Sequence, residues 1–183
     1  SRTDVKRLVE LYRRRVELAG EDDGDLKYDL LGKIADAQEK SLGSRRDAIE
    51  ALREALSVRP ADKAVLARLD RLFREEELWP DLLETLRLSA ASAETPEERV
   101  ALRRAMGDLY REKLDDPQEA LACYRQVLDE APGDDGAIAA ARSIGESREE
   151  LRAEMADILD PVLRLSGRWD DLVAVLELRL RAQ

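Results

Sequence analysis

Residues 95–132 read TPEERVALRRAMGDLYREKLDDPQEALACYRQVLDEAP, and they give the clearest indication of the fold class. The sequence TPEE at 95–98 places a side-chain acceptor before a helix, proline at its first position and a carboxylate at its third. The sequence DPQE at 116–119 repeats this start signal, and apolar residues follow at three- and four-residue spacing. The stretch therefore predicts two helices, 96–113 and 117–130, whose short connection makes them antiparallel neighbours.

The same arrangement recurs along the chain. Sliding the sequence by 72 residues aligns Pro60 with Pro132 and several apolar positions without a gap. A second match, at 90 residues, pairs Trp79 with Trp169 and implies 18 extra residues between the copies. Together with the helix start and stop signals, these repeats predict ten helices. Their expected spans are 2–19, 25–41, 45–57, 62–76, 80–93, 96–113, 117–130, 134–145, 148–166 and 169–182.

The composition favours an all-α chain. It has no Asn, nine Gly, six Pro and few β-branched residues, which disfavours the hairpin turns and pleated faces of a sheet. No run approaches the roughly 20 uncharged apolar residues of a membrane span. The first residues are charged, whereas a secretory signal needs an apolar run there. We expect a cytoplasmic protein without membrane insertion.

The composition also excludes most kinds of chemistry. The chain has no His, which removes the usual general base and the commonest metal ligand. Its one cysteine, Cys123, cannot form an internal disulfide or a zinc site, and we expect it in the core. No glycine-rich phosphate loop occurs, and a net charge of −10 opposes nucleic-acid binding. We therefore expect no enzyme, no catalytic residue, no cofactor and no metal.

The residues of 95–132 resemble the tetratricopeptide repeat (TPR) family, whose helix-turn-helix units of about 34 residues stack into a right-handed superhelix. The resemblance implies an all-α right-handed solenoid of about ten antiparallel helices. Small residues allow two helices to cross closely, tyrosines fill the space beside them, prolines end second helices, and tryptophans pack between helices. The positions concerned are Met106, Gly107, Tyr110, Ala120, Tyr124 and Pro132 in this unit, Ala35, Ala48 and Pro60 in an earlier one, and Trp79 and Trp169.

We expect one helical repeat array over 1–183. Residues 2–19 resemble the second helix of a pair without its first, and the final helix has no polar capping helix after it. Because solenoids usually need such caps, we expect either a segment of a longer chain or ends that associate into a homo-oligomer. The expected divisions are 2–19, TPR-like units 25–60, 61–94 and 95–132, an irregular insertion and helix over 133–168, and a terminal helix over 169–183.

In the resembled family the first helix of each pair lines a concave face that holds a peptide or partner protein. Carried over by position, this implies partner contacts from Arg71, Arg74, Arg104, Asp108 and Arg111. Guanidinium forks at these positions suit an acidic segment, and the alternative is surface arginines paired with neighbouring acids. Two functions therefore stay open: a protein-interaction scaffold, and a structural or self-assembling segment of a larger repeat protein.

Overall fold

The computed structural model describes residues 1–181, which form helices joined by short turns and contain no strand. Within this part the all-α, ten-helix prediction is confirmed. The predicted end of the last helix at 182 lies outside the described residues. The α-helices are α1 (Arg2–Leu18), α2 (Gly24–Asp36), α3 (Arg45–Val58), α4 (Lys63–Glu75), α5 (Trp79–Ala91), α6 (Pro96–Glu112), α7 (Pro117–Glu130), α8 (Asp135–Ser147), α9 (Arg152–Leu165) and α10 (Trp169–Leu180). Three short helical turns are η1 (Glu21–Asp23), η2 (Ala37–Leu42) and η3 (Glu149–Leu151).

Side-chain caps set where several helices begin. The Thr95 hydroxyl accepts the Glu98 N–H at 3.1 Å, and the Asp116 carboxylate accepts the Glu119 N–H at the same distance. Asp134 caps α8 in the same way, accepting the Ala137 N–H at 2.8 Å. Each cap satisfies a backbone donor that the first helical turn leaves unpaired, so the helix starts where the sequence signal places it.

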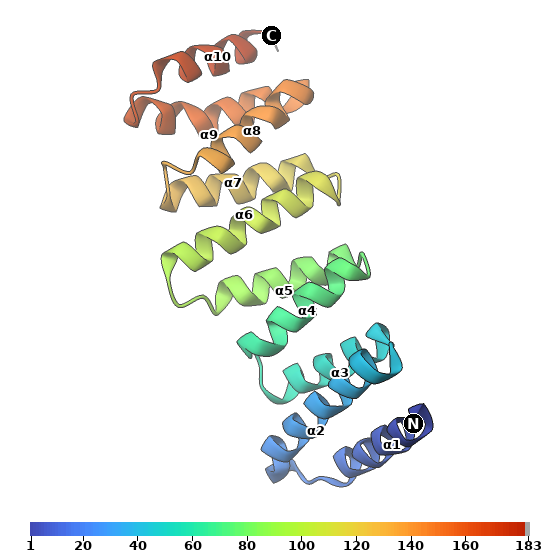
Figure 1. The fold of residues 1–183 in the computed structure, drawn as a ribbon. Helices are drawn as coiled ribbons and strands as arrows, with labels where there is room; N and C mark the ends of the chain where they lie inside the picture. The colour runs from blue at the N-terminus through green and yellow to red at the C-terminus, as the bar shows by residue number, and fades with distance from the viewer. Residues whose placement is uncertain (182–183) are drawn as a thin grey trace. The chain divides into compact units, whose positions relative to one another are not determined.

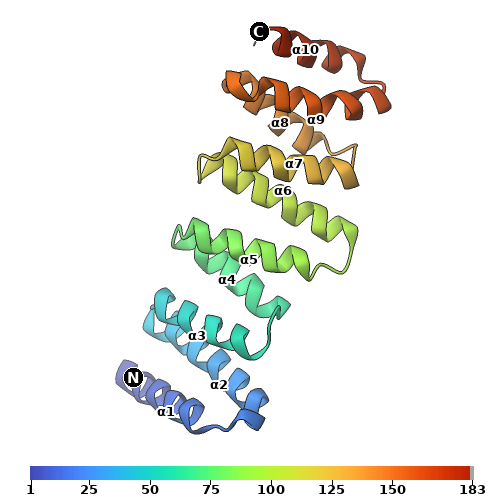
Figure 2. The same cartoon turned by 180° about the vertical axis from the view of Figure 1, so that it is seen from behind.

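The chain divides into two compact units, unit 1 (Ser1–Leu88) and unit 2 (from Ser89). In unit 1, α1 packs on α2 and η2, α2 on α3, and α3 on α4 (Figure 1). In unit 2, α6 packs on α7, α7 on α8, α8 on α9 and α9 on α10, an order that can also be followed from behind (Figure 2). Each unit is thus a row of antiparallel helices. The expectation of one array over the whole chain stays a prediction.

The segment 133–168 holds α8 and α9, separated by η3, where helices 134–145 and 148–166 were expected. The division of this segment as an irregular insertion stays a prediction. α9 begins at Arg152 and not at 148. It also continues through Pro161, although a proline inside a helix removes a backbone hydrogen bond. Pro161 lies on the exposed side of α9, so the carbonyl that its missing N–H leaves unpaired can bond to water.

Most repeat positions are buried in the helix packing. Tyr124 is fully buried, Tyr110 nearly so, and a Cβ added to Gly107 would lie 2.7 Å from Tyr124 Cε1, closer than real Cβ contacts come. Trp169 differs from expectation: it begins α10 but is 59% exposed, so most of its surface is outside the helix packing. The alanines at 35, 48 and 120 and Cys123 are buried, while Pro60 and Pro132 lie exposed just after the ends of α3 and α7.

Two familiar structural features are missing from residues 1–181. None of the helices described is both long and apolar enough to cross a membrane. No group of three or more Cys, Asp or Glu side chains in this part is placed to hold a metal ion.

Candidate protein-interaction surfaces

The α2–α4 groove is a hollow of about 250 Å³ in unit 1. α2 and α4 form its walls and α3 its floor, so α2 and α4 belong to one layer of the unit and α3 to the other. Gly32, in the middle of α2, has open space where a Cβ would be, with nothing within 4 Å. The groove therefore has an apolar floor and room for a side chain from outside. Its lining is Tyr28, Asp29, Gly32, Lys33, Asp36, Leu52, Ala55, Ala64, Val65 and Arg68.

Ion pairs join the two walls of this groove. Arg68 Nη2 on α4 lies 2.9 Å from Asp36 Oδ1 and 3.3 Å from Glu39 Oε2. Arg71 Nη2 donates to the other Glu39 oxygen at 2.5 Å. Burial of the Glu39 carboxylate raises its pKa, but the hydrogen bonds from Arg71 and Arg68 outweigh this effect and hold the pKa below its ordinary value. Glu39 lies in η2, which continues from α2, and its ionised carboxylate links this wall to α4.

Unit 2 contains a similar hollow, the α8–α10 groove, also of about 250 Å³. Its walls are α8 and α10 and its floor is Leu159 and Leu163 of α9. Arg168 contacts Asp135 at 2.5 Å and Asp171 at 2.8 Å, and so joins the two walls. Both units thus build the same kind of surface, an apolar floor between alternate helices with paired charges along the rim.

The predicted binding arginines of unit 1 already have acidic partners. Arg71 donates to Glu75 at 2.9 Å in addition to Glu39. Arg74 makes a two-pronged contact with Asp70, through Nε at 2.9 Å and Nη2 at 3.0 Å. These contacts favour the alternative interpretation, in which the arginines are paired with neighbouring acids, because an acidic ligand would have to displace an existing partner.

The predicted residues of unit 2 are also paired. Arg104 Nη1 lies 3.1 Å from Asp134 Oδ2, and Arg111 Nη2 donates to Glu112 Oε1 at 2.6 Å. Asp108 accepts a hydrogen bond of 2.7 Å from the Tyr124 hydroxyl. Burial of Tyr124, together with this bond, raises its pKa far above the usual range, so the hydroxyl keeps its proton. The predicted convergence of arginines from α4 and α6 spans both units and stays a prediction.

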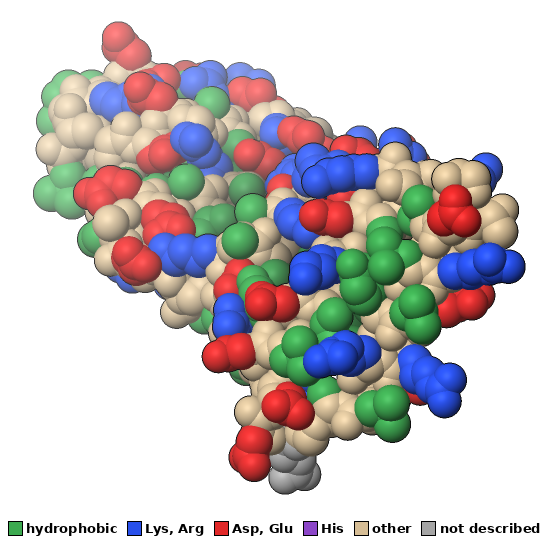
Figure 3. Space-filling model, turned by 60° about the horizontal axis from the view of Figure 1, so that its bottom comes forward, with side chains coloured by type: hydrophobic (Ala, Val, Ile, Leu, Met, Phe, Trp, Pro, Cys, Tyr) green, Lys and Arg blue, Asp and Glu red, His purple; other side chains and the backbone are tan. Residues whose placement is uncertain are grey.

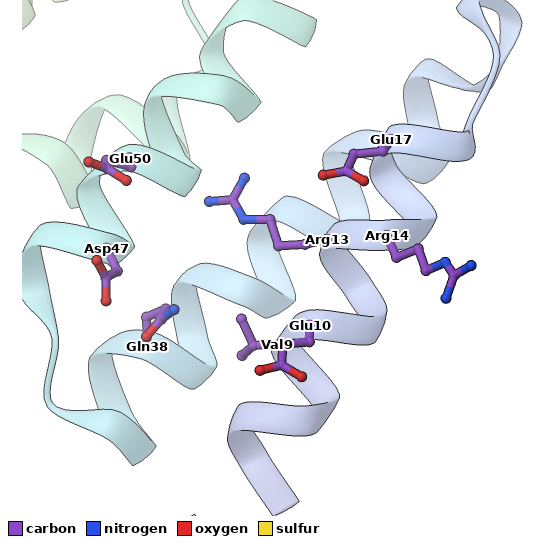
Figure 4. Close-up of a pocket in the computed structure, with 8 residues that line it drawn as sticks. All are labelled: Val9, Glu10, Arg13, Arg14, Glu17, Gln38, Asp47 and Glu50. Carbon is purple, nitrogen blue, oxygen red and sulfur yellow. The ribbon is translucent and has the colours of Figure 1, made fainter. Parts of the chain in front are cut away.

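A third hollow, of about 530 Å³, lies between α1 and α3 and is defined here as the α1–α3 hollow. Figure 4 shows Arg13 reaching from α1 across it toward α3, while Arg14 points away from it. Arg13 pairs with Glu54 of α3. The remaining lining consists of four acids, Glu10 and Glu17 on α1 and Asp47 and Glu50 on α3, together with Arg14, Val9 and Gln38.

Sequence reasoning missed several groove residues. Arg68 lines the α2–α4 groove, whereas the prediction selected Arg71 and Arg74 from the same helix. The available signal was the four-residue spacing from Ala64, which puts residue 68 on the same side of α4. Arg142 and Arg168 were missed because both lie in segment 133–168, which was not assigned to a TPR-like unit.

Comparison with known proteins supports the repeat interpretation. The model of the tetratricopeptide repeat family matches residues 101–137, which hold most of α6, all of α7 and the start of α8. None of the curated proteins matches the sequence.

Two solved structures are similar to the chain at low identity. "Crystal structure of MamA" is 16% identical over 98% of this chain and 89% of that chain, with a TM-score of 0.44. "Crystal structure of MamA protein" is 18% identical over 88% of this chain and 82% of that chain, with a TM-score of 0.46. At these values the two structures add nothing about activity or partners. The rows of antiparallel helices make the chain an all-α helical repeat protein, and it is similar to the tetratricopeptide repeat family over residues 101–137.

Proposed function

We propose that the chain is a non-catalytic scaffold that binds an extended segment of a partner protein in the α2–α4 groove. The observation that carries the proposal is the open position beside Gly32, above a floor that includes Leu52 and Ala55. A hollow of about 250 Å³ is smaller than the roughly 300–1,000 Å³ typical of small-molecule pockets. It suits one or two side chains of a peptide that continues along the groove.

The rim of the groove indicates the chemistry of the partner. Asp29 and Asp36 stand on one wall with Lys33, and Arg68 faces them from α4. Because the rim carries both signs and Arg68 is already paired with Asp36, a strongly charged ligand gains little there. We therefore propose a segment with an apolar anchor for the floor and polar or mixed-sign neighbours.

Filling the groove tests this proposal. In Gly32→Trp the new side chain should occupy the hollow without a steric clash in α2. Gly133→Trp is the matched control, because Gly133 also has open space where a Cβ would be but lies in the turn after α7, outside every groove described above. Proteins captured from a native lysate are compared by mass spectrometry. We expect Gly32→Trp to lose a partner that the original chain and Gly133→Trp retain.

If both tryptophan variants capture the same proteins as the original chain, the α2–α4 groove is not the binding site. Circular dichroism spectra of the three proteins should coincide, which separates a blocked groove from a misfolded chain. A captured partner is then cut into overlapping peptides, and the binding peptide should contain the apolar anchor.

The arginines at 71 and 104 provide a second candidate, an acidic partner. In Arg71→Gln the charge is lost without placing a new carboxylate beside Glu39 and Glu75. If an acidic segment binds at either arginine, the variant at that position should weaken its capture while helicity stays unchanged. Unchanged capture by both variants would contradict an acidic partner and indicate that these arginines serve only their intramolecular ion pairs.

A further inference from the structure

An exposed apolar stripe runs along α1, on the side away from α2. Leu8, Leu11 and Leu18 are 42%, 64% and 78% exposed, although they follow one another at helical spacing. At the near end of the view in Figure 3, which holds α1, hydrophobic side chains lie exposed next to basic ones. We define the α1 stripe by these leucines and the three exposed arginines beside them, Arg7, Arg14 and Arg15.

One position of the α1 stripe corresponds to a buried position of α5. Leu8 and Val9 match Leu82 and Leu83 of α5, which has a helical neighbour in α4 (Figure 1). Leu82 is fully buried, whereas Leu8 is 42% exposed. Within the described residues, therefore, α1 buries one side and leaves Leu8 uncovered, although the equivalent residue of α5, Leu82, is fully buried.

A second stripe lies on α10. Trp169, Val173 and Leu180 are 59%, 56% and 67% exposed, and together with Leu176 they recur at intervals of four, three and four residues. This spacing keeps them on one side of the helix, while Leu172 and Val175 are buried against the rest of unit 2. We define the α10 stripe by these four residues and the exposed acids beside them, Asp170 and Glu177.

The two stripes have complementary charges. Arg7, Arg14 and Arg15 form no ion pair among the residues that the structure describes, and neither does Asp170. Glu177 has only a loose contact with Arg181, at 3.9 Å between well-exposed groups. Asp4, which is in line with Leu8 and Leu11, is already paired with the Ser1 ammonium group at 2.8 Å. The charges without an ion pair are therefore basic beside the α1 stripe and acidic beside the α10 stripe.

The spacing of the charges also agrees. Arg7 and Arg14 are seven residues apart, as are Asp170 and Glu177. In an α-helix this separation is about 10.5 Å and returns to nearly the same side, so both charge pairs can form along one helix–helix contact. α10 has 12 residues and α1 has 17, so the shorter stripe can be covered along its whole length.

We propose that the α10 stripe of one copy of this chain packs against the α1 stripe of a second copy. The contact joins two different surfaces, so each copy keeps one free stripe and further copies can add. This association is independent of the α2–α4 groove, and a variant that blocks the groove leaves it unchanged.

Charge reversal tests the proposal with the complete chain. The first variant is Arg7→Glu with Arg14→Glu, and the second is Asp170→Arg with Glu177→Arg. Each variant places like charges on both of its stripes, whereas a mixture of the two restores opposite charges. The control, Lys40→Glu with Arg46→Glu, makes the same change in net charge as the first variant, at side chains that are 70% and 86% exposed, outside both stripes.

Sedimentation velocity then measures the mean mass between about 1 µM and 1 mM, the range in which weak contacts of this kind assemble. We expect the mass of the original chain and of the control to rise with concentration. Each stripe variant alone should need at least about tenfold more protein to reach the same mass, and an equimolar mixture should recover association. Leu11→Asp and Val173→Asp, at exposed positions, should each weaken it as well.

Four results would overturn the proposal. The first is a chain that stays monomeric throughout, which leaves the stripes to another partner. The second is an Asp170→Arg, Glu177→Arg variant that assembles like the original chain, since this indicates contact between two α1 stripes. The third is a mixture of the two variants that does not recover association. The fourth is a control variant that associates as weakly as the stripe variants.

Discussion

Because α6 and α7 approach closely at Gly107, alanine should destabilise the protein at Gly107 and stabilise it at Gly32. Alanine at either Gly107 or Gly32 replaces a glycine in the interior of a helix, which on its own stabilises the helix by about 1 kcal/mol. At Gly32 the new methyl group enters open space. At Gly107 it would lie 2.7 Å from Tyr124 Cε1, whereas ordinary contacts begin at 3.4 Å.

The Tyr124 ring cannot move away from this methyl group without losing packing contacts or its hydrogen bond. Tyr124 is fully buried, and its hydroxyl donates to Asp108 at 2.7 Å. Overpacking costs about 1–3 kcal/mol, and loss of the hydrogen bond about 1 kcal/mol more. After subtraction of the gain in helix propensity, we expect Gly107→Ala to lower the free energy of unfolding by about 1–3 kcal/mol. Gly32→Ala should raise it by up to about 1 kcal/mol.

Urea and thermal unfolding followed by circular dichroism measure both effects. Each kcal/mol should move Tm by about 2–4 °C in a chain of this size. In a Tyr124→Leu background the cost of Gly107→Ala should largely disappear, because the group that the methyl meets is gone. A Gly107→Ala protein as stable as Gly32→Ala, or a cost that persists without the Tyr124 ring, would refute the close approach.

Three further predictions follow from individual contacts. Tyr124→Phe should lower the free energy of unfolding by about 1 kcal/mol in urea melts, because it removes only the bond to Asp108, whose carboxylate water can reach. Glu39→Gln should cost up to about 1 kcal/mol at neutral pH. Since the folded pKa of Glu39 is depressed, its contribution is present above the ordinary value of 4.5 and is lost as the pH falls through the folded pKa, so the two proteins should converge in acid. A gap that stays constant down to low pH would contradict this account. Leu172→Ala should cost about 2–5 kcal/mol because the side chain is 4% exposed, whereas Trp169→Ala, at 59% exposed, should cost much less; equal losses in thermal melts would place the Trp169 ring inside the packing.

The local signals in the sequence were sufficient to place the ten helices, although α9 begins at Arg152 and not at 148. Caps such as Thr95 and Asp116 act on backbone groups a few residues away, so they specify the start of a helix without tertiary contacts. The same holds for Gly107 and Tyr124, whose spacing in a helical hairpin already indicated a close crossing. Pro161 shows the limit of such rules, because its effect on α9 depends on whether the freed carbonyl faces water.

The fold class, the ten helices and the residues that let them cross could therefore be predicted from local sequence. Tertiary packing sets which charges are already paired, which glycine opens into a groove, and which apolar residues are left uncovered. Arg71 and Arg7 are both surface arginines in the sequence, yet the first is paired with Glu39 on another helix and the second has no ion pair among residues 1–181. The physical reason is that pairing and burial depend on side chains that are distant in sequence, whereas helix formation depends on neighbours within one turn.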